Sequence, residues 1–124
     1  MSYSTSPRIA TIVFAIVIFF FGLNHLIIPE VVVKEVPSFF PAPVLWVYVT
    51  GVAQILAAIA LVLNKQVRLA GYLLAAMIVV IALVVHLNEV FNASSQEQQK
   101  IEVIFLAKDI AIAAAAFFIG SKNE

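Results

Sequence analysis

The segment that decides the fold runs from Val44 to Leu63 and reads VLWVYVTGVAQILAAIALVL. It contains no charged side chain, and its length matches the roughly 20 apolar residues that a helix needs to cross the hydrocarbon core of a bilayer. Backbone amides and carbonyls in lipid have no water to bind, so a spanning segment satisfies them internally as a helix. The segment therefore predicts a transmembrane α-helix.

Similar apolar stretches occur before and after this segment. The predicted spans cover about residues 8–28, 44–63, 69–90 and 100–120. Only residues 64–68 separate the second span from the third, so we expect these two helices to be antiparallel neighbours. The sequence predicts an all-α integral membrane protein, a four-helix transmembrane bundle in a single domain over residues 1–124. Residues 30–42 are expected to form a loop at the membrane interface.

Residues typical of helix ends flank the spans. Pro29 is expected to stop the first helix, and Asn64 is expected to end the second in a left-handed conformation. Ser95 followed by Gln98 resembles a capping box at the start of the fourth helix, and Gly120 is expected to close that helix.

The composition agrees with a membrane location. The 124-residue chain is 64% hydrophobic and 11% charged, whereas soluble domains are about 45–50% apolar and about 25% charged. Seven basic residues balance seven acidic ones, so nucleic acid is not expected as a partner. The lack of cysteine excludes disulfides, thiolate nucleophiles, iron–sulfur clusters and Cys-type zinc sites.

Basic residues near the helix ends predict the orientation, because Lys and Arg are enriched in cytoplasmic loops. One side of the predicted bundle carries Arg8, Lys65, Arg68 and Lys122. The other side carries Lys34 and Lys100. We therefore expect both termini on the cytoplasmic side, and a location in the bacterial cytoplasmic (inner) membrane.

Polar side chains inside the predicted spans are the candidates for function, because an ionisable group near the bilayer centre costs roughly 2.5–3.5 kcal/mol and usually faces protein. At about 1.5 Å per residue, these side chains all fall in the outer half of the bundle. The candidate ligand-binding residues are His25, Thr50, Gln54, His86, Glu89, Lys108 and Asp109. The sequence assigns no catalytic residue, and we expect no metal site.

Helical spacing suggests how these residues meet. Thr50 and Gln54 share one helix face, and His86 and Glu89 are close enough in sequence to touch. Lys108 and Asp109 diverge by about 100°, so each needs a partner on another helix. We expect an outward-facing polar pocket in which Lys108 pairs with Asp109 or Glu89 and both histidines lie at the rim.

Structural roles are open for each of these residues. Lys108 and Asp109 would also serve as an ion pair that locks the fourth helix into the bundle. His25 would serve as a helix-end hydrogen-bonding group, and Gln54 as an interhelical contact. The His86 to Glu89 segment would be solvated where the third helix leaves the membrane.

Several short motifs resemble the DoxX-like family of membrane proteins. They are GLNHLIIP at 22–29, VYVTG at 47–51, His86 near the end of the third span and LAKDIAI at 106–112. The resemblance covers about residues 8–120 and implies four transmembrane helices with both termini on one side. It also implies a redox context, because some members are membrane subunits of a thiosulfate:quinone oxidoreductase or quinol oxidase. Members often carry Glu where this chain has Gln54, so a proton-handling role at that position is not implied.

Three functions follow as hypotheses. The first is an accessory or membrane subunit of a redox system that binds a quinone-like headgroup, with a redox protein or a second copy of the chain as partner. The second is a non-enzymatic assembly or stability factor, and the third is a carrier or binder of a small amphiphile or ion. Haem held by the two histidines is a less favoured alternative, because bis-histidine membrane haem sites lie deeper. The sequence contains no self-contained catalytic motif and leaves enzymatic activity open.

Overall fold

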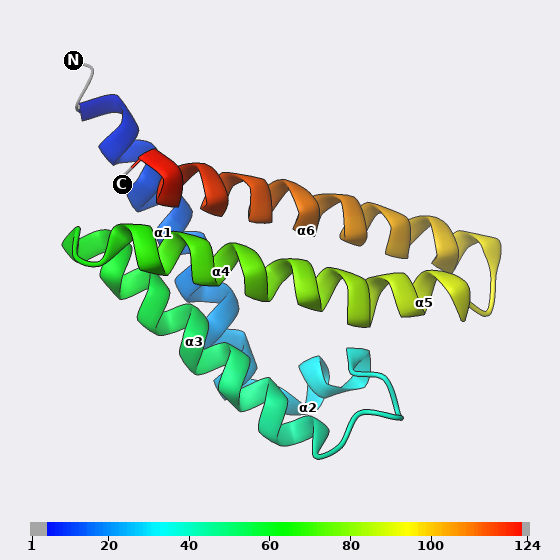
Figure 1. Ribbon diagram of the computed structural model, residues 1–124. Coiled ribbons are helices and arrows are strands. Elements are labelled where there is room, and N and C mark those ends of the chain that lie inside the picture. Colours follow the sequence, from blue (N-terminus) through cyan, green and yellow to red (C-terminus); the bar gives the residue numbers. More distant parts are fainter. Residues whose placement is uncertain (1–4, 123–124) are drawn as a thin grey trace.

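A computed structural model describes residues 5–122, and the described chain is helical without strands. Four helical segments are long and apolar enough to cross a membrane (Figure 1). They are Thr5–Ile27 (α1), Pro43–Leu63 (α3), Val67–Phe91 and Gln96–Lys122 (α6). The sequence-based prediction of an all-helical chain with four helices long and apolar enough to span a membrane is confirmed.

The third span is not one regular helix. It consists of α4 (Val67–Ile81), a π-helical stretch η2 (Ala82–His86) and α5 (Leu87–Phe91). A π-helix widens the turn by one residue and changes the direction of the side chains that follow. This irregularity sets where the end of the third span presents its polar residues.

The helix ends agree with some sequence signals and not with others. Asn64 ends α3 with φ 56°, as expected for a left-handed C-terminal residue. The Ser95 hydroxyl accepts a hydrogen bond from the Gln98 backbone amide at 3.1 Å, but the Gln98 side chain contacts Ser94 instead of completing a capping box. The prediction that Gly120 closes the last helix is wrong, because α6 continues to Lys122 and uses Gly120 as a packing position.

The connection between the first two spans is partly helical. Pro29 ends α1 as expected, but it also begins a short helix, α2 (Pro29–Val32), which is followed by the 3₁₀ turn η1 (Val33–Glu35). Proline suits a first helical position because its missing N–H would be unpaired there anyway. Residues 36–42 complete the connection to α3. The predicted interface loop at 30–42 therefore begins with helical backbone, up to Glu35.

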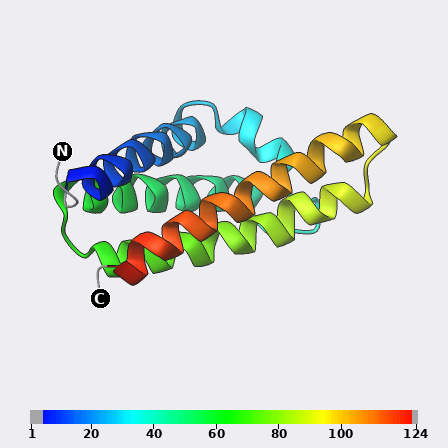
Figure 2. The same cartoon turned by 90° about the horizontal axis from the view of Figure 1, so that it is seen from above.

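The spans pack as two pairs. α1 lies along α3, and α4 lies along α6, whereas α3 and α4 meet mainly near the turn that joins them (Figures 1 and 2). Small residues allow the close approach of α4 and α6. A Cβ atom added to Gly71 of α4 would lie 2.6 Å from the backbone nitrogen of Gly120 in α6.

The hydrophobic core occupies the half of the bundle near the α3–α4 turn. Its buried members include Ile18, Leu61, Leu74 and Ala116, one from each span. In the same half, the Arg8 guanidinium donates to two backbone oxygens in the last turn of α3, those of Leu61 (2.6 Å) and Val62. The start of α1 and the end of α6 thus lie at the turn end, and the opposite half of the bundle is left less tightly packed.

Candidate functional site

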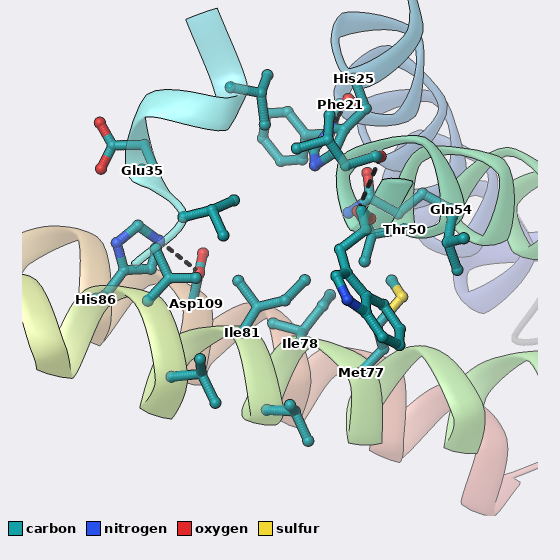
Figure 3. A pocket seen from close by; sticks show the side chains of 18 of the residues that line it. Phe21, His25, Glu35, Thr50, Gln54, Met77, Ile78, Ile81, His86 and Asp109 are labelled. Carbon is teal, nitrogen blue, oxygen red and sulfur yellow. Dashed lines mark hydrogen bonds and ion pairs between the residues drawn. The ribbon is translucent and has the colours of Figure 1, made fainter. Parts of the chain in front are cut away.

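A cavity of about 710 Å³ lies between the two helix pairs, in the half of the bundle away from the core (Figure 3). Its walls are mostly apolar and come from α1, the α2–η1 connection, α3, α4, η2 and α6. Six of the seven sequence-predicted ligand residues line it: His25, Thr50, Gln54, His86, Lys108 and Asp109. Glu89 is not among the lining residues.

The polar residues of the cavity fall into two groups on opposite sides (Figure 3). We call His25, Thr50 and Gln54 the amide group. We call Glu35, His86 and Asp109, together with Glu102, which contacts His86 but does not line the cavity, the histidine–carboxylate cluster. Ile78, Ile81 and Met77 form an apolar floor between the two. This arrangement is that of a site for a molecule with an apolar body and polar atoms at both ends.

Gln54 is the most unusual residue of the amide group. It is 6% exposed, and its Oε1 atom has no hydrogen-bond partner among the described residues. A buried acceptor without a donor costs about 1–3 kcal/mol relative to one that is satisfied. The side chain also packs against α1, since a Cβ added to Gly22 would lie 3.2 Å from the Gln54 Cβ. Gln54 lines the cavity, but its Oε1 is buried, so rotation of the amide is needed to turn this acceptor into the cavity.

His25 and Thr50 are held in place by backbone carbonyls. The His25 Nδ1–H donates to the Phe21 carbonyl oxygen at 2.8 Å, which leaves Nε2 as an acceptor. The Thr50 hydroxyl donates to the Trp46 carbonyl oxygen at 2.9 Å. The lack of a side chain at Gly51 provides the room for His25, since a Cβ there would lie 2.5 Å from the His25 Cβ.

His86 joins two carboxylates of α6. Its Nε2 lies 3.1 Å from Asp109 Oδ2 and its Nδ1 lies 3.4 Å from Glu102 Oε2. The three side chains are 14%, 14% and 7% exposed, respectively, for His86, Asp109 and Glu102. Asp109 therefore has the partner on another helix that its position requires. The π-helix η2 sets the side-chain direction of His86 at this point of the third span.

The expected pairing of Lys108 with Asp109 or Glu89 is wrong. The Lys108 Nζ lies over the rings of Phe21 (5.6 Å) and Phe105 (5.1 Å) and makes no salt bridge within residues 5–122. Because neighbouring side chains on a helix diverge by about 100°, Asp109 faces His86 while Lys108 faces α1. The cation is stabilised by aromatic faces rather than by a carboxylate.

Glu35 and Glu102 also belong to the cluster, although neither was among the candidate ligand-binding residues predicted from the sequence. One donor atom from each of Glu35, His86 and Glu102 lies within 4.8 Å of the others. Desolvation raises the pKa of Glu35, and the nearby charges of Glu102 and Glu89 raise it further, whereas His86 opposes the shift. Glu35 belongs to the connection between spans, where no helical period indicates which way a side chain points.

Comparison with known proteins gives a family but no activity. No curated protein matches the chain, and no solved structure does. A family model described as a domain of unknown function (DUF8561) matches residues 14–120, a range that includes every residue of the amide group and of the histidine–carboxylate cluster. The match covers well over half of the chain, and the protein belongs to the DUF8561 family.

Proposed function

We propose that this membrane protein binds the ring headgroup of a quinone or quinol in the cavity and serves as an accessory or membrane subunit of a redox system. The observation that carries the proposal is the unpartnered Gln54 Oε1, a buried acceptor on a side chain that lines a large, mostly apolar cavity and that rotation of the amide would turn toward a ligand. Its volume of about 710 Å³ lies within the usual range of about 300–1,000 Å³ for small-molecule sites.

The polar atoms on the two sides of the cavity suit the two oxygens of a quinol. Gln54 Oε1 and His25 Nε2 are acceptors and would each take a hydrogen bond from a hydroxyl group. Asp109 lies on the opposite side and would accept from the second hydroxyl. The ring would lie against Ile78, Ile81 and Met77. The resemblance to DoxX-like proteins supports the redox context of this proposal.

A Gln54→Leu variant is expected to lose bound quinol. The substitution keeps the volume of the wall but removes the buried acceptor, and a lost hydrogen bond of about 1–3 kcal/mol corresponds to about 5- to 150-fold in affinity. The stability of the empty protein should not fall, because the removed oxygen has no protein partner. Mass spectrometry of solvent extracts from protein purified in mild detergent measures the bound quinone per chain.

The matched control is Gln96→Leu, the same change at an exposed position outside the cavity. Quinone that co-purifies with the wild type and with Gln96→Leu, and is lost from Gln54→Leu, supports the proposal. A phospholipid or fatty acid in place of quinone favours a carrier of amphiphiles. A protein that binds none of these contradicts the proposal and favours an assembly factor, and a Soret band would indicate haem.

We also infer that the α3–α4 turn and both chain ends face the cytoplasm of a bacterial inner membrane. Arg8, Lys65, Arg68 and Lys122 belong to this end of the bundle, as the positive-inside tendency requires. Reporter fusions in residues 36–42 are expected to report a periplasmic location, and fusions in residues 64–66 a cytoplasmic one. The reverse result would contradict the orientation.

A further inference from the structure

The histidine–carboxylate cluster brings together three metal-ligating side chains from separate elements. Glu35 comes from η1, His86 from the π-helix η2 and Glu102 from α6. Their donor atoms lie within 4.8 Å of one another. Because Glu35 is exposed, rotation of its side chain can bring its oxygen nearer to the other two donors. The combination of one imidazole nitrogen and two carboxylate oxygens is a ligand set that divalent transition metals accept.

The contact between His86 and Asp109 orients the imidazole for such a role. When the Nε2–H donates to Asp109 Oδ2 at 3.1 Å, the Nδ1 atom carries a lone pair toward Glu102. Two acceptors, Nδ1 and Glu102 Oε2, then face each other at 3.4 Å. A cation between them would turn this unfavourable contact into coordination. A carboxylate on the outer nitrogen is also the usual support of a metal-bound histidine.

The charge of the region is unbalanced. Glu35, Glu102 and Asp109 surround a single imidazole, and the field of Glu89 also acts on Glu35. Across residues 5–122, no lysine or arginine forms a salt bridge with any of them. Even a protonated His86 would leave a net negative charge among side chains that are mostly buried. Desolvated charges of this kind are normally paired or bound to a metal.

The depth of the cluster gives an ion from water access to it. At about 1.5 Å per residue, Glu102 lies about 30 Å from the Lys122 end of α6, and His86 lies about 28 Å from the start of α4. The hydrocarbon core is about 30 Å thick. The cluster therefore lies near one membrane surface when the α3–α4 turn lies at the other.

We propose that Glu35, His86 and Glu102 form a binding site for a divalent transition-metal ion of the Zn²⁺ or Mn²⁺ type, at the end of the cavity farther from the α3–α4 turn. This differs from the expectation of no metal site from the sequence. Asp109 orients His86 through its outer nitrogen and is not itself a ligand. The site does not depend on what occupies the cavity, and a bound ion would tie the α2–η1 connection to η2 and α6.

Titration calorimetry on purified protein tests the proposal. The full chain in mild detergent is stripped with EDTA, the EDTA is removed, and ZnCl₂, MnCl₂ or MgCl₂ is added. We expect one Zn²⁺ or Mn²⁺ per chain, with a rise in Tm on binding, and much weaker binding of Mg²⁺, which prefers oxygen ligands and keeps its waters. Glu35→Gln should weaken binding by at least about tenfold, since even second-shell changes cost about 10–100-fold.

Glu89→Gln is the matched control, because it removes a nearby negative charge from a residue that is not a proposed ligand. It should change the affinity much less than Glu35→Gln does. Glu35 is exposed and makes no hydrogen bond or salt bridge in the described chain, so its variant should fold, and the Tm without metal verifies this. A wild type that binds neither Zn²⁺ nor Mn²⁺, or equal losses in the two variants, would overturn the proposal.

Discussion

The His86→Leu variant loses about 3–5 kcal/mol of unfolding free energy, the largest effect that we expect of any single substitution in this protein. Leucine cannot pair with Asp109 or Glu102, and both carboxylates are mostly buried. Removing the imidazole leaves buried carboxylates without the hydrogen bond to Asp109, which costs much more than the contact contributes. Unfolding of the purified protein by titration with a denaturing detergent, in the presence of EDTA, measures the loss.

Lys108→Met is the comparison for that experiment. The ammonium group has aromatic neighbours and no carboxylate partner, so the substitution should cost about 1 kcal/mol or less. If Lys108→Met lowered the unfolding free energy as much as His86→Leu does, then Lys108, and not His86, would be the residue that stabilises the buried carboxylates. The contrast reverses what the adjacent charges at 108 and 109 suggest when they are considered only as a sequence.

Gly71→Ala is expected to produce the second largest effect, a loss of about 1–3 kcal/mol. The three atoms nearest to the new Cβ are Gly120 N at 2.6 Å, Gly120 Cα at 2.7 Å and Ala116 O at 2.8 Å. All three belong to the backbone of α6, so no side chain can turn aside and the two helices must separate. The same denaturing titration measures the change.

Two further variants serve as comparisons for Gly71→Ala. A Cβ on Gly120 would meet its neighbours at 3.1 Å, so Gly120→Ala should cost less than Gly71→Ala. Leu73→Ala changes a residue that is 60% exposed on the same helix and should have little effect. Equal stability of Gly71→Ala and the wild type would show that α4 and α6 do not pack through these glycines.

The number of spans and their approximate positions could be predicted because length and hydropathy determine them. The bilayer requires about 20 apolar residues in a helix, and each of the four stretches meets this requirement. The cap at Asn64 was also predictable, since asparagine tolerates the left-handed conformation that ends a helix. Depth along the helices was enough to place six of the seven candidate residues in one cavity.

The partners of those residues could not be predicted, because they depend on rotation about the helix axes. The π-helix η2 alters the direction of the His86 side chain by adding a residue to one turn. The regular spacing of an α-helix does not predict this change of direction. Glu35 belongs to the connection between the first two spans, which has no regular helical repeat, so the sequence does not indicate where its side chain points. Asp109 contacts His86 at the position where η2 directs the imidazole toward α6, whereas Lys108, about 100° further around α6, contacts aromatic rings.

The division of the spans into two pairs has a consequence for how the cavity is filled. Since the pairs meet mainly near the α3–α4 turn, the space between them would face acyl chains over the rest of its height when the bundle spans a bilayer. A ligand of the proposed kind, dissolved in the bilayer, would then reach the site from the side, at a concentration set by its mole fraction in lipid. Added detergent dilutes that molecule without changing its affinity, so occupancy on purification should fall with the detergent-to-protein ratio.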